Sequence, residues 1–397
     1  MTYYKYLIIG GGLTGDAAIR GIRELDPQGS IGMISMEPDP PYVRPNLSKG
    51  LWKGLPIEKI WSNTNKLGVS LYLERKAVEL DPKKKIVYDN QGGQYTYNKL
   101  LLATGGSPIR LPFGNDTIIY YRDYQDYQRL RALSDRGERF LVIGGGFIGA
   151  EIAAALTMNG KNVVMVFLED SIGTNIYPRD LSLFLNEYYR QKGVEVIPGD
   201  AVTSLEQMGD RFSIRTRTGR AFEVDGVVAG IGIRPNLDLA QLAGLHLENG
   251  IVVDEKLHTS VPDIYAAGDV ANFYHSALGK HVRVEHEDNA IQMGKQAGRN
   301  MAGANESYTH VPMFYSDLFD LGYEAVGELS SKLEMVADWK EPYKEGVVYY
   351  LEGDRMRGIL LWNIWDAVPA ARALLAEAGP FERADLKRSI LQERKEE

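Results

Sequence analysis

The fold of this chain is decided by the stretch Leu7-Ile8-Ile9-Gly10-Gly11-Gly12-Leu13-Thr14-Gly15. It reads as an apolar strand that runs into the pattern G-x-G-x-x-G, with Gly10, Gly12 and Gly15 in register. The first glycine of this pattern permits a tight turn, the second lets the backbone approach a pyrophosphate, and the third lets the next helix pack against the strand. The stretch therefore predicts a dinucleotide-binding turn; a turn that serves packing alone is the alternative.

The residues that follow this loop complete the pattern. We expect a helix from Thr14 to about Leu25, whose N-terminal N–H groups face the phosphates, and then a strand from Ser30 to Met36. Glu37 ends that strand about 20 residues beyond the loop, where a carboxylate can bind ribose hydroxyls.

The same pattern occurs a second time. An apolar strand at 140–143 precedes the glycine loop Gly144 to Gly149, a helix from Ala150 to Met158 and a strand at 163–167. Two complete units imply two dinucleotides, and two copies of a packing motif without a ligand are the alternative. Glu169 ends the second copy of this strand–loop–helix–strand pattern. Its carboxylate would repel a 2′-phosphate, which favours NADH over NADPH.

Two cations stand out in the segment after Glu37. Four prolines between Pro38 and Pro45 deny it a regular helix, so we expect a shaped loop that leads into a short helix near Leu47 to Trp52. Arg44 and Lys49 are either solvated, as most cations are, or lie over a flavin. In the second case Arg44 is near phosphate or ribityl, and Lys49 is near the isoalloxazine.

Three further strands end in small residues, at 100–106, 227–232 and 264–268. Small residues let the chain pass close to a cofactor. Asp269 follows the last of these strands and is either a helix N-cap or an acceptor for ribityl hydroxyls. A helix opened by the acidic run 285–289 should reach about Met301.

Composition excludes several classes of protein. The 397 residues carry a net charge of −8, which argues against a nucleic-acid partner. Cysteine is absent, so there is no disulfide framework, thiolate metal site or redox-active thiol pair. The acidic run holds a single histidine, and no metal is predicted. No apolar run reaches 18 residues and no signal peptide is evident, so we expect a cytoplasmic protein without a membrane span. We also expect a monomer or a homodimer.

Taken together, these motifs resemble the two-dinucleotide-binding-domain flavoproteins of the pyridine nucleotide reductase superfamily. Within it the chain looks like apoptosis-inducing factor and its prokaryotic relatives, next to the bacterial ferredoxin reductases. The resemblance spans almost the whole chain. It rests on the phrases Pro41-Tyr42-Val43-Arg44-Pro45-Asn46-Leu47-Ser48-Lys49, Gly144-Gly145-Gly146-Phe147-Ile148-Gly149-Ala150-Glu151, Val284-Glu285-His286, Phe314-Tyr315-Ser316-Asp317 and Leu361-Trp362-Asn363-Ile364.

The resemblance implies an α/β fold with two Rossmann-like three-layer domains of the glutathione reductase type and a C-terminal α+β domain. The implied boundaries are a discontinuous FAD-binding domain at 1–109 and 224–300, an NAD-binding domain at 110–223, and an interface domain at 301–397.

The resemblance also implies which residues bind FAD and NADH. Those for FAD are Gly10, Gly11, Gly12, Leu13, Thr14, Gly15, Glu37, Arg44, Lys49, Ala77, Arg122, Asp269, His286 and Glu287. Those for NADH are Gly145, Gly146, Phe147, Ile148, Glu169, Gly232, Glu285, His286, Tyr315, Glu324 and Asn363. It further pairs Lys49 with Glu151 beside the flavin N5, with Phe147 close to the ring, and a buried lysine does need a compensating carboxylate.

Three features depart from the eukaryotic members of that group. Tyr315 stands where they usually carry tryptophan, the regulatory insertion expected between about Leu333 and Gly346 is essentially missing, and no mitochondrial targeting or anchoring segment is evident.

The expected activity is that of an FAD-dependent NADH oxidoreductase. NADH passes hydride to flavin N5, Lys49 with Glu151 tunes the flavin, and Tyr315 or Phe147 gates access. The electrons then go to an unidentified acceptor: a quinone, a dye, oxygen or an iron–sulfur protein. The alternatives are a dedicated ferredoxin or rubredoxin reductase and a redox-sensing interaction protein whose partner surface responds to NADH.

Overall fold

A computed structural model describes residues 1–387 and 390. Its residues fall into two compact units. The first consists of residues 1–45, 56–107 and 234–312, and the second of 46–55, 108–233 and the chain from 313 onward. The finer division into three domains, with its implied boundaries, stays a prediction.

The first unit is built on a seven-stranded sheet of order β3-β2-β1-β6-β5-β4, with β18 also paired to β6. The strands are β1 (Thr2–Ile9), β2 (Ile31–Ile34), β3 (Ser70–Tyr72), β4 (Ala77–Asp81), β5 (Ile86–Asp89), β6 (Gln94–Leu102) and β18 (Ile264–Ala266). Strands β3, β2, β1, β6 and β18 are parallel, and β6, β5 and β4 are antiparallel. The runs Leu7–Ile8 and Leu100–Leu102 are fully buried, as apolar runs in parallel strands usually are.

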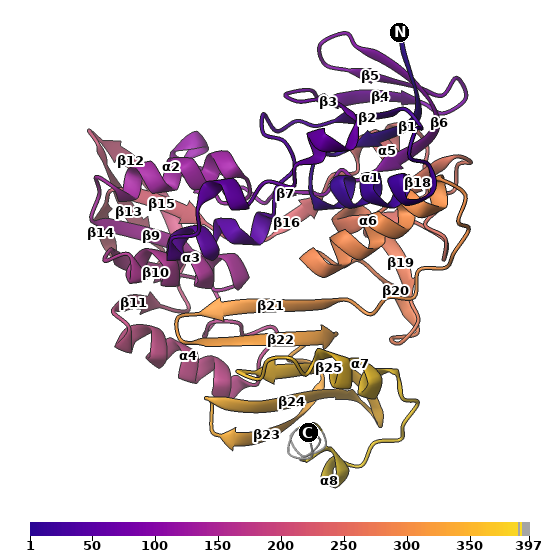
Figure 1. Ribbon diagram of the computed structural model, residues 1–397. Coiled ribbons are helices and arrows are strands. Elements are labelled where there is room, and N and C mark those ends of the chain that lie inside the picture. Colours follow the sequence, from indigo (N-terminus) through magenta and orange to yellow (C-terminus); the bar gives the residue numbers. More distant parts are fainter. Residues whose placement is uncertain (388–389, 391–397) are drawn as a thin grey trace. The chain divides into compact units, whose positions relative to one another are not determined.

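Two helices of the first unit, α1 (Leu13–Leu25) and α6 (Glu287–Met301), lie side by side (Figure 1). Glycines allow this approach: a Cβ on Gly21 would lie 2.1 Å from the Lys295 carbonyl oxygen, and one on Gly298 would lie 2.0 Å from that of Ala18. The other elements of the unit are η3 (Ile57–Lys59), η4 (Thr64–Leu67), α5 (Asp238–Leu242), β17 (Ile251–Val252), η6 (Gly268–Val270), β19 (Ala271–His275) and β20 (Lys280–Val282).

The second unit holds a five-stranded parallel sheet of order β11-β10-β9-β15-β8. Its strands are β8 (Ile118–Tyr120), β9 (Arg139–Ile143), β10 (Asn162–Val166), β11 (Val194–Ile197) and β15 (Gly226–Ala229). Helices α2 (Tyr124–Ser134), α3 (Phe147–Met158) and α4 (Arg179–Gln191) pack on these strands. An antiparallel sheet of β12 (Val202–Met208), β13 (Arg211–Thr216) and β14 (Ala221–Val224) shares their core.

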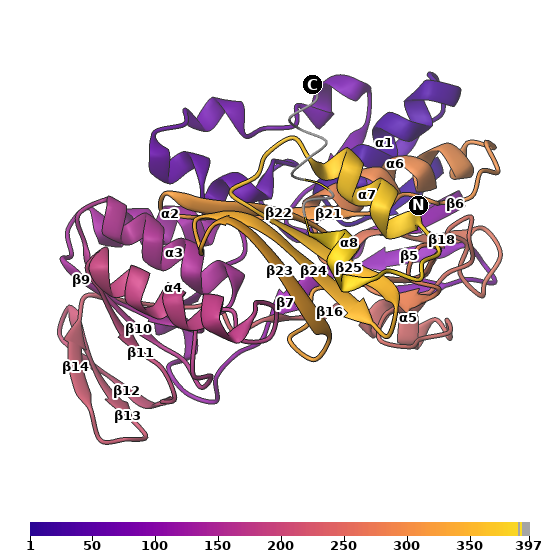
Figure 2. The same cartoon turned by 90° about the horizontal axis from the view of Figure 1, so that it is seen from below.

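The same unit contains a second five-stranded sheet, antiparallel and of order β21-β22-β25-β24-β23 (Figure 2). Its strands are β21 (Met313–Leu318), β22 (Leu321–Gly327), β23 (Glu334–Glu341), β24 (Glu345–Glu352) and β25 (Arg355–Trp362). Helix α7 (Val368–Ala376) packs on β22 and β25, and α8 (Arg383–Leu386) contacts β23. The predicted α+β character of this region is confirmed as far as the described residues reach.

The remaining elements are short, and three of them carry the chain from one unit to the other. The three connecting elements are η1 (Arg44–Leu47), β7 (Gly106–Pro108) and β16 (Ile233–Pro235). The other two short elements are η2 (Gly50–Lys53) and η5 (Asn115–Thr117). Two 3-10 turns, η1 and η2, replace the single helix predicted near Leu47 to Trp52. Gly54, in the left-handed conformation at φ 88°, ends η2 after one turn. Two other boundaries also differ, since α3 begins at Phe147 rather than Ala150 and His286 precedes α6 as its N-cap.

Candidate functional site: two glycine loops and a buried ion pair

The first glycine loop lies between β1 and α1. Gly10 has a φ of +124°, and a Cβ on Gly15 would lie 2.2 Å from the Gly10 carbonyl oxygen, so both positions require glycine. A Cβ on Gly12 would meet only the Arg44 guanidinium, at 3.9 Å. Gly12 is also the N-cap of α1 and provides no side-chain cap. The loop is therefore closed on its protein side and open above its second glycine, which fits a pyrophosphate at a helix N-terminus.

Glu37 and Arg44 form an ion pair beside this loop. An Arg44 N–H group donates to Glu37 Oε1 at 2.6 Å, and the Tyr42 hydroxyl donates to Glu37 Oε2 at 2.7 Å. Arg44 also donates to the Tyr42 hydroxyl at 3.1 Å. The carboxylate predicted to bind ribose and the cation predicted to contact phosphate or ribityl are thus paired with each other. The Arg44 guanidinium lies at the open side of the glycine loop.

The other residues of the first unit that were expected at FAD lie on three elements. Ala77 begins β4, Asp269 lies in η6, and Glu287 begins α6. A Cβ on Gly268 would lie 2.2 Å from Thr14 Oγ1, so the turn that carries Asp269 packs against the glycine loop. Ala267, not Asp269, occupies the N-cap of η6, so the N-cap alternative for Asp269 is wrong.

His286 stands at the N-cap of α6. Its burial lowers the pKa of the imidazole to about 4, although the carboxylates of Asp269 and Asp288 act in the opposite direction. His286 is therefore neutral at neutral pH. Glu285, which the resemblance assigns to NADH, is its exposed neighbour and pairs with Arg283.

The second glycine loop lies between β9 and α3 and has the same backbone geometry as the first. Gly144 has a φ of +112°, and a Cβ on Gly149 would lie 2.0 Å from the Gly144 carbonyl oxygen. No protein atom of the described chain lies within 4 Å of a Cβ on Gly146, the N-cap of α3. The space directly above Gly146 is therefore open, and the loop fits the pyrophosphate of a second dinucleotide.

This second loop opens into a cavity of about 440 Å³. The cavity is lined by the loop from Gly144 to Phe147, by Glu169 and Gly232, by the segment 171–177, and by Ser316. Glu169 is exposed at the end of the strand, as expected for a carboxylate that meets ribose hydroxyls from solvent. Five of the residues predicted for NADH, namely Gly145, Gly146, Phe147, Glu169 and Gly232, are thereby brought to one cavity.

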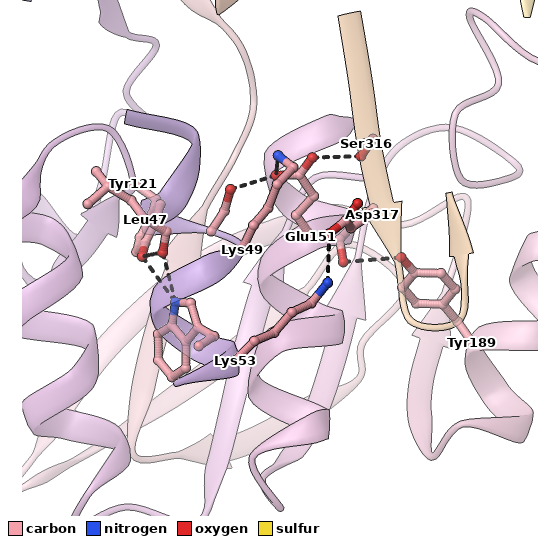
Figure 3. Close-up of polar contacts among 11 residues, drawn as sticks. Leu47, Lys49, Lys53, Tyr121, Glu151, Tyr189, Ser316 and Asp317 are labelled. Carbon is pink, nitrogen blue, oxygen red and sulfur yellow. Dashed lines mark hydrogen bonds and ion pairs between the residues drawn. The ribbon is translucent and has the colours of Figure 1, made fainter. Parts of the chain in front are cut away.

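Lys49 and Glu151 form the buried ion pair of the second unit (Figure 3). The Lys49 ammonium donates to Glu151 Oε2 at 2.8 Å. Glu151 lies within α3 and is only 4% exposed. The turn that carries Lys49 is fixed by the Leu47 carbonyl oxygen, which accepts from the Tyr121 hydroxyl at 2.6 Å and from the Trp52 indole at 2.9 Å. The pairing implied by the resemblance is thus present, held between a short turn and a buried helix.

Aromatic rings border the pair. The Lys49 ammonium lies 5.1 Å from the centroid of Tyr315, which β21 carries. Phe147 is 38% exposed, and its ring meets Phe314 edge-on at 6.0 Å. Tyr315 is thus placed beside Lys49, and Phe147 beside the nucleotide cavity.

Glu324 and Asn363 lie on the C-terminal sheet. Glu324 is directly opposite Tyr315 on β22, and its Oε2 is buried without a hydrogen-bond partner in the described chain. Burial raises the pKa of its carboxyl; a hydrogen bond with the Asp366 backbone opposes this rise, and the charge of the Asp366 side chain adds to it. Asn363 has a φ of 51° and spans a corner, accepting from the Gly322 N–H at 2.6 Å and donating to the Lys344 carbonyl oxygen at 2.8 Å. Both polar atoms of Asn363 thus serve the fold.

The expected FAD residues are divided between the two units. Lys49 and Arg122 belong to the second unit, and the others belong to the first. The Arg122 backbone N–H donates to Asp126 at 2.9 Å, at the start of α2. Among the expected NADH residues, Glu285 and His286 belong to the first unit and the rest to the second. The roles of all these residues stay predictions.

Two residues of the site had no role in the sequence analysis. Ser48 Oγ donates to Glu151 Oε2 at 2.6 Å, and Ser316 Oγ donates to Glu151 Oε1 at 2.6 Å. Both serines stand next to predicted residues, Lys49 and Tyr315, and this adjacency was the only signal for them. Within the described residues, no three His, Asp or Glu side chains gather closely enough to hold a metal ion.

Two equivalent glycine loops, each closed by its own backbone and open over its second glycine, define a two-dinucleotide oxidoreductase. Residues 4–294 match the family described as pyridine nucleotide-disulphide oxidoreductase. Residues 297–343 and 337–377 match the C-terminal domain described as apoptosis-inducing factor, mitochondrion-associated. The chain belongs to the pyridine nucleotide-disulphide oxidoreductase family.

Individual relatives support the same assignment. Apoptosis-inducing factor 1 of Dictyostelium discoideum is 32% identical over 96% of this chain and 79% of its own length. Monodehydroascorbate reductase 3 of Arabidopsis thaliana is 32% identical over 95% of this chain and 93% of its own length. The ferredoxin reductase subunit of the 5,5'-dehydrodivanillate O-demethylase of a Sphingobium strain is 31% identical over 96% of both chains.

Among solved structures, the reductase of a covalent putidaredoxin reductase–putidaredoxin complex matches with a TM-score of 0.91 and 26% identity, over the full length of both chains. The α/β fold, the FAD and NAD cofactors and the enzyme class predicted from the sequence are confirmed. This protein is an FAD-dependent NAD(P)H oxidoreductase that passes electrons from the nicotinamide nucleotide to an acceptor. Among its described helices, none combines the length and apolar character that a membrane crossing requires.

Proposed function

We propose that this protein oxidises NADH in preference to NADPH, with the Lys49–Glu151 pair acting at the flavin. The observation that carries the proposal is the position of Ser316, which lines the nucleotide cavity and also donates to Glu151. The ion pair therefore lies directly behind the wall of the cavity that would receive the nicotinamide nucleotide.

Bound FAD supplies the ring that accepts hydride from NADH at N5. The chain's own residues bind and orient. The residues proposed to hold FAD are those of the first glycine loop with Glu37, Arg44, Ala77, Arg122, Asp269, His286 and Glu287. Those proposed for NADH are the second loop with Glu169, Gly232, Glu285, His286, Tyr315, Glu324 and Asn363. Lys49 presents a positive charge that favours electron density on the flavin, and Tyr315 and Phe147 restrict access.

The preference for NADH rests on Glu169. Its carboxylate accepts hydrogen bonds from ribose hydroxyls and repels a 2′-phosphate. Because the side chain is exposed at the rim of the cavity, that repulsion is partly screened, and we expect a preference rather than complete exclusion.

The test uses the purified holoprotein. Anaerobic NADH should bleach the flavin absorbance rapidly, and the isosteric double variant Lys49→Met/Glu151→Gln should slow the limiting rate of that reduction. Neutralising both partners avoids leaving a buried charge unpaired, which would cost about 3–5 kcal/mol of stability. A wild-type rate in the double variant would remove the pair from the role. A flavin that NADH and NADPH both leave oxidised would overturn the whole proposal.

Two of the similar proteins support a small iron–sulfur protein as the acceptor. The Sphingobium relative is named a ferredoxin reductase subunit, and the structural match was solved with putidaredoxin. Cytochrome c reduction with and without an added ferredoxin decides this point, because a dedicated ferredoxin reductase depends on the carrier. Slow turnover with every acceptor, together with oligomerisation that depends on NADH, would instead favour a redox-sensing interaction protein.

A further inference from the structure

The carboxylate of Glu151 accepts from three side chains, and their distribution over its two oxygens is uneven. Ser316 Oγ donates to Oε1 at 2.6 Å. Ser48 Oγ and the Lys49 ammonium share Oε2, at 2.6 and 2.8 Å. The two hydroxyls thus occupy positions on the carboxylate that the ammonium could otherwise take.

This distribution limits how strongly Glu151 holds Lys49. A carboxylate accepts about four hydrogen bonds and an ammonium donates three, so without the serines both oxygens could turn toward Lys49. With the serines in place, Lys49 meets Oε2 alone, and its ammonium lies 5.1 Å from the Tyr315 ring centroid. The charge of Lys49 is therefore only partly neutralised by its partner.

We propose that Ser48 and Ser316 are positioning residues that restrain Glu151 and so set how much of the Lys49 charge acts on the flavin. This inference rests on the proposed function, in which Lys49 acts on the flavin. Removing Ser316 lets Oε1 turn toward Lys49, which strengthens the ion pair and weakens the field of the ammonium on the flavin. The bound flavin then becomes harder to reduce.

A purely structural role for the serines makes a different prediction. A buried carboxylate needs donors, and the hydroxyls could serve that need alone. Their loss would then lower thermal stability without moving the reduction potential of the flavin. The two roles are separated by measuring both quantities in the same variants.

The experiment compares holoprotein variants Ser316→Ala, Ser48→Ala, Glu151→Gln and Ser316→Ala/Glu151→Gln by dye-coupled redox titration, thermal unfolding and anaerobic stopped flow. Ser182→Ala is the matched control, since its hydroxyl is also buried in the second unit but has no hydrogen-bond partner in the described chain. In Ser316→Ala we expect a more negative midpoint potential and a limiting rate of flavin reduction lower by roughly tenfold, as for other losses of positioning. The Kd for NADH should stay within about twofold, and Ser316→Thr should restore both quantities.

The double variant decides whether Ser316 acts through Glu151. If it does, Ser316→Ala has no further effect on the potential once Glu151 is glutamine. An unchanged potential in both serine variants, or an effect that adds to that of Glu151→Gln, overturns the inference. A weaker Kd for NADH at a normal rate does so as well, because Ser316 is then a nucleotide contact. If Glu151→Gln itself alters neither rate nor potential, the proposed role of the ion pair fails instead.

Discussion

The phenolic hydroxyl of Tyr350 donates a hydrogen bond of 2.7 Å to the carbonyl oxygen of Ile176, 174 residues away in the chain. Tyr350 is a fully buried residue of β24, and Ile176 lies in the segment 171–177 that lines the nucleotide cavity. The neighbouring ring of Tyr177 lies edge-on to Tyr323 at 5.7 Å and to Trp362 at 5.6 Å. The C-terminal sheet therefore supports one wall of the cavity.

Removing this hydrogen bond should weaken nucleotide binding without touching the nucleotide. Tyr350→Phe loses one buried neutral hydrogen bond, worth about 1 kcal/mol, so we expect the Kd for NADH to rise roughly two- to fivefold. Spectral titration of the anaerobic holoprotein with NADH measures this change. Tyr97→Phe is the control, because the Tyr97 hydroxyl is buried in the first unit without a partner in the described chain. A Tyr350→Phe protein that binds NADH normally would show that the wall does not depend on the sheet.

The carboxylate of Glu169 should determine the choice of nucleotide. Glu169→Ala removes an acceptor for ribose hydroxyls and a charge that repels the 2′-phosphate, so the ratio of kcat/KM for NADH over NADPH should fall by about tenfold. Steady-state kinetics with both nucleotides measure the ratio. Glu195→Ala removes an exposed carboxylate of β11 that does not line the cavity, and it should leave the ratio unchanged. An unchanged ratio in Glu169→Ala would refute the assignment.

The second glycine of each loop should be required by the ligand and not by the fold. Gly146 has an ordinary φ of −86° and no described protein atom within 4 Å of the methyl group that alanine would add, so Gly146→Ala should keep its Tm within a few degrees. The methyl group would occupy the space of a pyrophosphate, and NADH affinity should fall by about tenfold while FAD stays bound. Gly12→Ala, in the first loop, should instead weaken FAD binding and reduce the FAD content of the purified protein. Nucleotide binding that is insensitive to both changes would contradict the two loop assignments.

Asp126 should make the protein less stable as the pH rises from about 4 to 6. Burial, reinforced by the Asp123 carboxylate, raises the pKa of Asp126 from its ordinary 3.8 to about 6. Between these values the Asp126 carboxyl binds more protons in the folded protein than in the unfolded chain, so its contribution to stability is greatest below about pH 4 and declines as pH increases through 6, by at most about 1.4 kcal/mol per pH unit.

The variant Asp126→Asn tests this dependence, because the amide oxygen can still accept from the Arg122 N–H. Calorimetry at pH 4 and 7 should show a smaller difference in Tm for this variant than for the wild type, mainly through higher stability at pH 7. Asp135→Asn, an exposed position just after the same helix, should retain the wild-type difference.

Local chemistry explains why much of the fold could be predicted. Strands β9 and β10 lie within one residue of the predicted ranges 140–143 and 163–167, because their apolar runs and flanking turns are signals that lie within a few neighbouring residues. Both glycine loops were predicted for the same reason. The segment from Arg44 to Gly54 was harder to predict. Pro45, Gly50 and Gly54 break it into two 3-10 turns, and the hydrophobic pattern alone did not distinguish these from one short helix.

The site could be predicted only in part. Arg44 and Lys49 were singled out from the sequence, but the choice between solvated and functional cations stayed open. The structure places both in ion pairs, with Glu37 and Glu151, and leaves both side chains only partly exposed. The partner of Lys49 came from the family resemblance, since nothing near Lys49 in the sequence points to a carboxylate 102 residues later.

The amino-acid sequence by itself determined that this protein has two dinucleotide-binding turns and no thiol chemistry, because backbone freedom at glycine and the absence of cysteine are local properties. Only the tertiary structure decided that Ser48 and Ser316 would meet on one buried carboxylate, from positions 103 and 165 residues away from Glu151. The physical reason is that a hydrogen bond requires its donor and acceptor to lie within about 3 Å, and which distant residues satisfy that requirement depends on how the helices and sheets pack.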